Sequence, residues 1–386
     1  MKKQERDSIS LTINNERISV AAGTTIREAA AVIGVNIPGF CHLPGRKDTS
    51  EPCLICMVEV NGEMAEACRT QVAADMVVRT TTPAIDKHRR QRLEYLLSFH
   101  YGDCKAPCNL TCPGGINVQG YVNYIAKGEY GAALALIREQ NPLPGIVCRV
   151  CPRFCESRCR RVLIDEPVAI NHLKRFVVEY GRQSAPPLQP GPATGYRAAV
   201  IGGGPAGLSC ASYLRQFGHE VTIFEARERL GGMPRYAIPS FKLPDVEIDR
   251  ELETIGGLGF QVRTGKRWGR DFSLQDLREQ GFDAIFAAIG IAGQKKNDLP
   301  GAEYTQDALD FLQDLRAGKR GAAGTRTLVI GGSQLAVETA RCAMRDGAEE
   351  VTVVYQRAKV EMNAHQRDID EAEREGVQFF MMAQPL

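Results

Sequence analysis

The sequence predicts a multidomain chain in which a small α+β domain precedes a helical, cysteine-rich domain and two α/β domains with parallel sheets. Three observations support this fold class. Short alternating strands surround one early helix, eleven of the 13 cysteines lie between residues 41 and 159, and two strand–glycine turn–helix units follow residue 196. A chain of 386 residues has room for roughly two to four domains.

Composition narrows the class of protein. Lys plus Arg number 48 and Asp plus Glu number 46, so the net charge of +2 gives no reason to expect nucleic acid as a partner. No run of 18 apolar residues and no signal peptide are visible, so we expect a cytoplasmic protein without a membrane span. In such a chain, clustered cysteines indicate metal binding more than disulfides.

Residues 1–98 are expected to form the α+β domain. Strands are predicted at 9–13 and 17–20 around Asn14-Asn15, and at 57–60 and 77–79. Thr25 and Glu28 form a capping box that begins a helix over 26–33. The spacing C-x11-C-x2-C-x11-C suits a [2Fe–2S] cluster, and a tetrahedral zinc site is the alternative. The candidate ligands are Cys41, Cys53, Cys56 and Cys68.

The segments IPGFCHLPG, EPCLICMVEV and EACRT carry a resemblance over about the first hundred residues. They resemble the N-terminal ferredoxin domain of the large peripheral iron–sulfur subunit of respiratory complex I. Related domains occur in NAD-linked formate dehydrogenases and iron hydrogenases. The resemblance implies a ferredoxin-like fold in which all four cysteines bind the cluster.

Residues 99–182 are expected to be helical, with helices over 117–127 and 130–139 that bring two groups of cysteines together. The segments CKAPCNLTCP, NPLPGIVCRVCPRFCESRC and EPVAINHLKRF resemble the double-cluster domain of the glutamate synthase small subunit and of dihydropyrimidine dehydrogenase. That resemblance implies two [4Fe–4S] clusters. The candidate ligands are Cys104, Cys108, Cys112, Cys148, Cys151, Cys155 and Cys159.

Two cubane clusters need eight ligands, and seven cysteines leave one place open. The family often has a carboxylate or amide in the following helix, but the matching position here is near Lys174. Complex I's large subunit has a His-x3-Cys pair at the place of His100, so His100 is our hypothesis for the eighth ligand. Asn171 and His172 are alternatives, and His100 could instead cap or pack at the domain junction.

Residues 183–196 hold four prolines and two glycines and are predicted to be a linker. A nucleotide-binding domain is expected over 197–324, where a strand at 197–201 leads into GGGPAG and a helix. The glycines permit the turn, the approach of a pyrophosphate and close helix packing, and an acid at the end of the next strand would bind ribose. The residues are Gly202, Gly204, Pro205, Ala206, Gly207 and Glu225.

A second glycine pair, Gly231-Gly232, marks a loop close to FAD in the flavoproteins that this chain resembles. The segment ERLGGMPRYAIPSFKLP resembles the glutamate synthase small subunit, and FDAIFAAIG (282–290) resembles the strand that leads back from the nucleotide domain. The resemblance therefore implies an FAD-binding domain.

Residues 325–386 are expected to form a partial NAD(P)-binding domain, with strands at 327–330 and 351–355. Ser333 replaces the second glycine of the family's G-x-G-x-x-A turn and is expected to crowd the pyrophosphate. The family usually has two arginines for the 2′-phosphate of NADP; Gln356 and Arg357 stand there, which favours NADP over NAD. The candidate residues are Gly331, Gly332, Ser333, Ala336 and Arg357. Because the second domain stops early, we expect a truncated product or a fragment of a longer protein.

The resemblance implies an NAD(P)H-dependent iron–sulfur flavoprotein that passes electrons between NAD(P)H, FAD and clusters to a partner subunit. That partner would be a glutamate synthase large subunit, or a subunit of formate dehydrogenase or hydrogenase type. The cofactors do the chemistry, so no catalytic acid, base or nucleophile is expected. One alternative is a glutamate synthase small subunit proper, and another is a non-catalytic electron carrier or inactive fragment.

Overall fold

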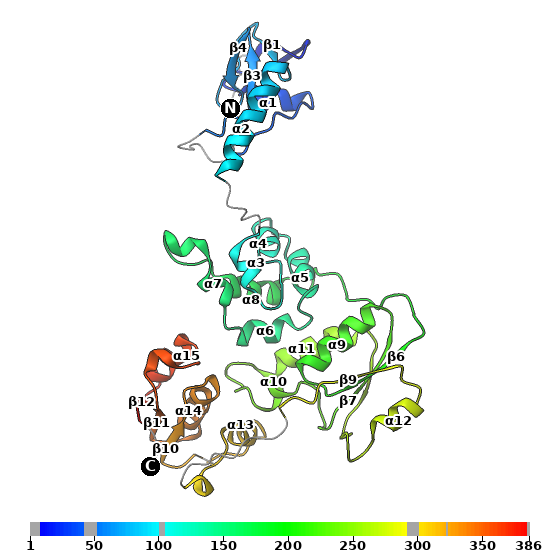
Figure 1. Ribbon diagram of the computed structural model, residues 1–386, viewed down its shortest axis with the longest axis vertical. Coiled ribbons are helices and arrows are strands. Elements are labelled where there is room, and N and C mark those ends of the chain that lie inside the picture. Colours follow the sequence, from blue (N-terminus) through cyan, green and yellow to red (C-terminus); the bar gives the residue numbers. More distant parts are fainter. Residues whose placement is uncertain (1–7, 42–51, 100–104, 292–300, 322, 384–386) are drawn as a thin grey trace, which may run out of the picture. The chain divides into compact units, whose positions relative to one another are not determined.

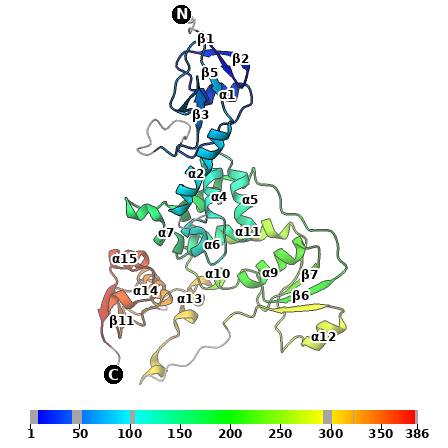
Figure 2. The same cartoon turned by 45° about the horizontal axis from the view of Figure 1, so that its top comes forward.

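The computed structural model describes residues 8–41, 52–99, 105–291, 301–321 and 323–383. It divides into two compact units, residues 1–104 and 105–386, which are treated separately below. Figures 1 and 2 show their helices and strands in two orientations. Two of the candidate site residues, His100 and Cys104, lie outside the described residues.

The first unit is built on a five-stranded sheet with the order β2-β1-β5-β3-β4. Strand β1 pairs antiparallel with β2 and parallel with β5, and the turn between β1 and β2 places Asn14 and Asn15 at positive φ. The apolar side of α1 covers the sheet through Ile26, Ala29 and Ala30, which are fully buried. The elements are β1 (Ser8–Ile13), β2 (Glu16–Ala21), α1 (Ile26–Val32), β3 (Met57–Val60), β4 (Glu63–Glu66), β5 (Val77–Arg79) and α2 (Pro83–Ser98).

The capping box predicted at Thr25 is confirmed: its hydroxyl accepts the Glu28 N–H, and the Glu28 carboxylate accepts the Thr25 N–H at 2.8 Å. Two elements were not predicted, strand β4 and helix α2. Thr82 caps α2, and Pro83 occupies its first turn, where its missing N–H costs nothing. Within α2 only Ile85 is buried, so the helix has no wide apolar face.

The second unit begins with a group of helices around the buried Tyr121 and Leu134. Helices α4, α5 and α8 contact one another, and α6 packs on α8 (Figure 1). The cysteines lie in the short helices and bends at the ends of this group. The elements are α3 (Pro107–Thr111), α4 (Val118–Ala126), α5 (Tyr130–Arg138), α6 (Pro144–Val150), α7 (Phe154–Ser157), η1 (Arg160–Leu163) and α8 (Ile170–Tyr180).

A parallel four-stranded sheet follows, with the order β8-β7-β6-β9. Helix α9 packs on β6 and β7, and α11 of the same region contacts α6 of the helical group (Figure 2). The elements are β6 (Arg197–Ile201), α9 (Pro205–Gln216), β7 (Glu220–Phe224), α10 (Met233–Tyr236), α11 (Asp245–Gly256), β8 (Gln261–Arg263), α12 (Leu274–Glu279) and β9 (Ala284–Ala287).

The last segment forms a parallel sheet with the order β10-β11-β12, and α14 packs on β10 and β11. Its core contains Val337, Val351 and Val353, all fully buried. The elements are η2 (Ala302–Tyr304), α13 (Ala308–Arg316), β10 (Arg326–Ile330), α14 (Gln334–Asp346), β11 (Glu350–Tyr355), η3 (Lys359–Glu361), α15 (Gln366–Arg374) and β12 (Gln378–Met381).

The predicted fold class is confirmed: a β-sheet domain, a helical domain and two Rossmann-type sheets follow one another along the chain. Within the described ranges, no helix has both the length and the apolar character needed to cross a bilayer.

Candidate functional site

The loop from Cys53 to Cys56 in the first unit is held in an unusual backbone conformation. Leu54 has φ +57°, in the left-handed region of backbone space. This conformation is unfavourable for a residue that has a side chain, so it is found only where surrounding contacts hold the backbone in place. Helix α2 supplies these contacts. His88 donates to the Leu54 carbonyl at 3.2 Å, and Arg89 donates to the Ile55 carbonyl at 3.1 Å. These basic residues were missed from the sequence, although the run KHRRQR was a visible signal.

The thiols of this unit approach one another. The sulfur atoms of Cys56 and Cys68 are 3.3 Å apart, and the Phe40 N–H donates to the sulfur of Cys53 at 3.4 Å. Burial alone would raise the pKa of Cys53, but backbone N–H groups and the Cys41 side chain hold that pKa below its ordinary value. Hydrogen bonds to sulfur favour the thiolate that a cluster requires. Burial and the neighbouring Cys56 thiol raise the pKa of Cys68 to about 12, so the fit to a [2Fe–2S] cluster rests on the close approach of the thiols.

The helical group brings cysteines from its two ends together. The Cys108 thiol interacts electrostatically with Cys159 and Cys112, and burial raises its pKa. Burial also raises the pKa of Cys155 to about 11, with a further contribution from the neighbouring charge of Cys151. Residues some 40 positions apart thus share one environment, as the sequence predicts for helices that return the chain.

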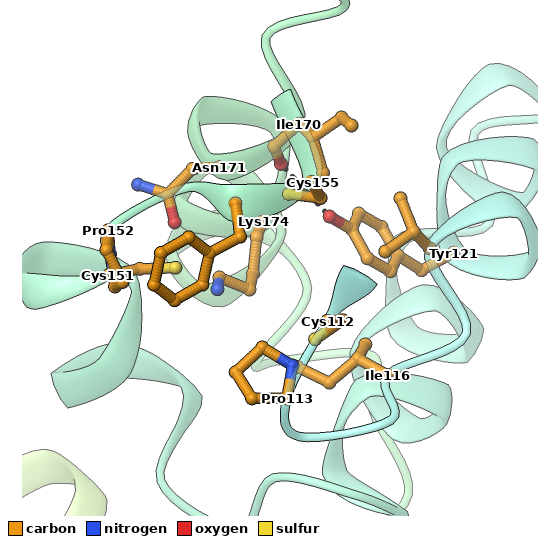
Figure 3. Close-up of a pocket in the computed structure, with 12 residues that line it drawn as sticks. Cys112, Pro113, Ile116, Tyr121, Cys151, Pro152, Cys155, Ile170, Asn171 and Lys174 are labelled. Atoms are coloured by element: carbon orange, nitrogen blue, oxygen red, sulfur yellow. Dashed lines mark hydrogen bonds between the residues drawn. The ribbon is translucent and has the colours of Figure 1, made fainter. Parts of the chain in front are cut away.

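Three of these thiols line one pocket. Cys112, Cys151 and Cys155 reach it from three different segments (Figure 3). Its volume is about 50 Å³, several times what one water molecule needs. The wall is mainly apolar, with Asn171 and Lys174 as its polar members. The other lining residues are Pro113, Ile116, Val118, Tyr121, Pro152, Phe154 and Ile170.

Cys148 lies apart from that pocket. Its side chain is buried, and its thiol donates to the Gly145 carbonyl at 3.3 Å. Within the described residues, no three Cys, His, Asp or Glu side chains converge as ligands of a single metal ion do. The cysteines of a cubane cluster bind different iron atoms, so they need a wider spacing than ligands of one ion. The assignment of individual ligands stays a prediction.

The first glycine-rich turn has the shape that a dinucleotide requires. Gly202 has φ +109°, and a Cβ there would lie 2.2 Å from the Ala288 carbonyl oxygen. A Cβ at Gly207 would lie 1.9 Å from the Gly202 carbonyl oxygen, so helix α9 can pack this closely only without a side chain. No side chain caps the N-terminus of α9, which leaves its N–H groups available for a phosphate.

Glu225 and the second glycine pair lie beside this turn. The Glu225 carboxylate accepts the Gly203 N–H at 2.6 Å and the Arg227 N–H at 2.8 Å. It therefore fixes the turn itself, and the contact with ribose stays a prediction. Gly231 and Gly232 both have positive φ, and a Cβ at Gly232 would lie 2.7 Å from the Cα of Gly204. The two glycine segments pack against each other at the α9 N-terminus, where Pro205 and Ala206 begin the helix.

The second glycine-rich turn differs from the first. The Ser333 hydroxyl caps α14 by accepting the Ala336 N–H at 3.3 Å, so one N–H group that a phosphate would use is already bonded. A Cβ at Gly332 would meet the Tyr355 ring at 2.7 Å, while Gly331 has φ +129°. Arg357 is exposed at the end of β11. Its guanidinium has no hydrogen bond or ion pair with another described residue.

A buried ionic cluster joins the helical group to the first nucleotide-binding sheet. Arg182, just after α8, donates to Glu247 and Glu251 of α11 at 3.2 Å each. Arg149 of α6 pairs with Glu247 at 3.5 Å. Both carboxylates are almost fully buried, and burial raises the pKa of Glu251 to about 6. This cluster could not be predicted from the sequence, because its members are far apart along the chain.

Three protein families match successive parts of the chain. Residues 6–83 match the 2Fe-2S iron-sulfur cluster binding domain. Residues 101–185 match dihydropyrimidine dehydrogenase domain II, described as a 4Fe-4S cluster domain. Residues 196–385 match pyridine nucleotide-disulphide oxidoreductase.

Curated relatives share this arrangement over much of the chain. NADPH-Fe(3+) oxidoreductase subunit beta of Geobacter sulfurreducens is 32% identical over 372 residues, which cover 89% of this chain and 55% of that protein. NADP(+)-dependent formate dehydrogenase subunit beta of Moorella thermoacetica is 36% identical and covers 72% and 43%. A homolog of the dihydropyrimidine dehydrogenase subunit PreT of Salmonella typhi is 32% identical and covers 70% and 67%. The chain thus spans about half of the length of the first two relatives.

Proposed function

Because the chain belongs to the family of NAD(P)H oxidoreductase subunits with 2Fe-2S, 4Fe-4S and pyridine nucleotide-disulphide oxidoreductase domains, we propose that it transfers electrons between NAD(P)H, FAD and iron–sulfur clusters. A partner catalytic subunit would exchange electrons with the clusters. The observation that carries the proposal is the pocket where Cys112, Cys151 and Cys155 meet. It lies in the same compact unit as the nucleotide-binding sheets.

The chain's own residues supply position and environment. When bound, FAD accepts a hydride and releases electrons singly, and iron–sulfur clusters carry single electrons. The bare N-terminus of α9 would hold the FAD pyrophosphate, and the glycine pair at 231–232 would keep the adjacent loop close to it. The apolar wall of the cysteine pocket would exclude water from a bound cluster and so affect its reduction potential.

The cofactors proposed are one [2Fe–2S] cluster, two [4Fe–4S] clusters, FAD and NADP. Cys41, Cys53, Cys56 and Cys68 would bind the first. The seven cysteines of the helical domain and His100 are the candidate ligands from which the two cubanes would draw. We also propose the domains predicted from the sequence, at 1–98, 99–182, 197–324 and 325–386, with a linker over 183–196. A reducing, cytoplasmic setting suits so many free thiols.

NADP is proposed over NAD because of Arg357. An arginine at the end of β11 can form a charge-assisted hydrogen bond with a 2′-phosphate. Two of the relatives are named for NADPH or NADP(+), and the Salmonella relative is named for NAD. The neighbouring Gln356 removes one of the two cations that the family usually has there.

The partner proposed is a separate redox subunit. The Geobacter and Moorella relatives are each named as a subunit beta, one of an iron(III) reductase and one of a formate dehydrogenase. A formate dehydrogenase-type partner agrees with the N-terminal 2Fe-2S domain. A glutamate synthase large subunit and a hydrogenase subunit are the other partners to be tested.

The test is anaerobic titration of the purified chain, loaded with FAD, by NADPH and separately by dithionite. We expect NADPH to bleach the flavin absorbance and then to produce the EPR signals of reduced clusters. Dithionite should give the same cluster signals without nucleotide. Cluster signals with dithionite alone, and no bleaching with NADPH, would favour the electron-carrier alternative.

A further inference from the structure

Asn171, in the first turn of α8, has a buried oxygen atom without a hydrogen-bond partner among the described residues. Only 4% of the residue is exposed, and no described N–H or O–H group donates to its Oδ1. Buried carbonyl oxygens are nearly always bonded, so an unbonded one calls for a specific explanation. The residue lines the cysteine pocket, and in Figure 3 its oxygen points toward the pocket interior while its nitrogen points away.

One hydrogen bond fixes the orientation of this amide, and two more hold the backbone around it. Its Nδ2 donates to the Cys148 carbonyl at 2.8 Å, which excludes the flipped amide because two carbonyl oxygens would then face each other. Its backbone N–H donates to the Glu156 carboxylate at 2.8 Å. The Tyr121 hydroxyl donates to the preceding carbonyl, that of Ile170, at 3.0 Å. The surroundings thus hold the oxygen in place without satisfying it.

We propose that Asn171 Oδ1 is the fourth protein ligand of the [4Fe–4S] cluster held by Cys112, Cys151 and Cys155. The inference rests on the proposed function, which places a cubane cluster in this domain. Three thiolates on the pocket wall supply three of the four ligands. A buried amide oxygen that faces the pocket and is not hydrogen-bonded to a described residue is a donor that can complete the set.

The neighbouring candidates fit this role less well. Lys174 is buried in the same pocket, but a protonated amine has no free electron pair for iron. His172 is exposed, and its Nε2 lies 3.3 Å from an Arg153 nitrogen. Cys148 directs its thiol to the Gly145 carbonyl, so its contribution is the backbone oxygen that positions Asn171.

The count of ligands agrees with this assignment. With Asn171 in place, the cluster in the pocket does not need Cys148. The remaining cysteines, Cys108, Cys159 and Cys104, would share the second cubane with His100. His100 and Cys104 lie outside the described residues.

An amide ligand also explains a lysine in this position. Replacing a thiolate by a neutral amide makes the cluster one charge less negative, and the buried Lys174 ammonium offsets a further charge. Lower negative charge raises the reduction potential of an iron–sulfur cluster. The centre beside Asn171 should therefore be reduced at a higher potential than an all-thiolate cubane in the same domain.

The test uses the full chain, purified anaerobically, with iron analysis, Mössbauer spectra and EPR-monitored reduction by dithionite. In Asn171→Ala we expect the pocket cluster to lose one iron atom and to show the EPR signal of a [3Fe–4S] centre when oxidised. Asn171→Asp keeps an oxygen donor but adds a charge, so all iron should remain and the reduction potential should fall. Asn171→Cys should lower the potential further.

The matched controls are His172→Ala and Asn123→Ala, the latter at an exposed amide of α4, and both should keep the iron content and both cubane spectra of the unsubstituted chain. Wild-type iron content, spectra and potential in Asn171→Ala would overturn the proposal. If Asn171→Ala does not fold, the Asp variant decides, because an unchanged potential and spectrum there would equally refute ligation. If the proposed function itself is wrong, the unsubstituted chain will lack cubane iron, or NADPH will not reduce its flavin. These results are distinct from an unchanged Asn171→Ala variant.

Discussion

The buried ionic cluster around Arg182 makes a strong prediction about stability. Arg182→Met removes the guanidinium that pairs with Glu251 and Glu247 while keeping much of its apolar length. Glu251 is 1% exposed and would be left with a backbone N–H as its main partner. Glu247 keeps Arg149 and Arg250. The loss of stability in Arg182→Met should therefore come mainly from the unpaired Glu251 carboxylate.

The magnitude follows from this geometry. Removing one partner of a buried ion pair costs about 3–5 kcal/mol, because the other charge stays buried. Because the two glutamates keep other contacts, we expect Arg182→Met to lower the free energy of unfolding by about 3 kcal/mol, near the lower end of that range. Since 1.4 kcal/mol corresponds to a factor of ten, local opening between α6 and α11 should become roughly 100-fold more frequent.

Hydrogen exchange of the cofactor-loaded chain measures that opening. Amides of α6 and α11 should exchange roughly 100-fold faster in Arg182→Met. The matched control is Arg161→Met, which breaks an exposed 2.6 Å pair with Asp165 and should leave exchange in α6 and α11 unchanged. Equal exchange rates in the two variants would show that the buried Arg182 pairs do not stabilise this contact.

The same cluster predicts a dependence on pH. Burial raises the pKa of Glu251 from 4.5 to about 6, and Arg182 partly offsets that rise. Because the folded pKa is the higher one, the carboxyl group's stabilising contribution is complete below pH 4.5 and is lost as the pH rises through about 6. Without Arg182 the pKa of Glu251 rises further, so the stability lost in Arg182→Met should become smaller as the pH falls from about 8 toward 6. A loss of stability that does not change with pH would show that Glu251 is not its source.

Three further predictions concern the nucleotide-binding region. Gly207→Ala places a Cβ 1.9 Å from the Gly202 carbonyl oxygen and should abolish copurifying FAD, whereas Gly256→Ala, with nothing within 4 Å, should keep the flavin-to-protein ratio. Arg357→Ala should raise the dissociation constant for NADPH about tenfold and leave that for NADH unchanged, by fluorescence titration. Lys242→Met leaves two buried carboxylates of α14 and α15 facing each other and should speed hydrogen exchange there by roughly 100-fold. Lys242→Arg should restore most of the protection, and equal exchange in both variants would contradict this assignment.

Local determinants explain what the sequence predicted well. The Asn14-Asn15 turn and the Thr25 capping box depend on residues within four positions of each other, and both are present as predicted. The glycine turn at 202–207 is also determined locally, because a side chain at Gly202 or Gly207 would clash with a backbone oxygen. Such features need no knowledge of the rest of the fold.

Two missed elements show different limits. Strand β4 had a signal, since Asn61 and Gly62 form the positive-φ turn of a hairpin. Helix α2 lacks an apolar stripe, so periodicity could not reveal it. Its attachment depends on carbonyls of the Cys53–Cys56 loop, which accept hydrogen bonds from Arg89 and Arg92. That is a tertiary interaction.

The ligand question shows the same limit at the candidate site. From the sequence, His100, Asn171 and His172 were all open as the ligand beyond the seven cysteines. What separates Asn171 from His172 is burial and the fixed direction of one oxygen atom. Neither property can be obtained from spacing, because adjacent residues of a helix point about 100° apart and only the packed structure shows which one meets the pocket.

Iron quantification with EPR of the dithionite-reduced chain shows whether the protein carries three iron–sulfur clusters. We expect about ten iron atoms per chain, no stoichiometric zinc, and signals of one [2Fe–2S] and two [4Fe–4S] clusters. Zinc in place of iron, or iron sufficient only for the [2Fe–2S] cluster, would contradict this expectation.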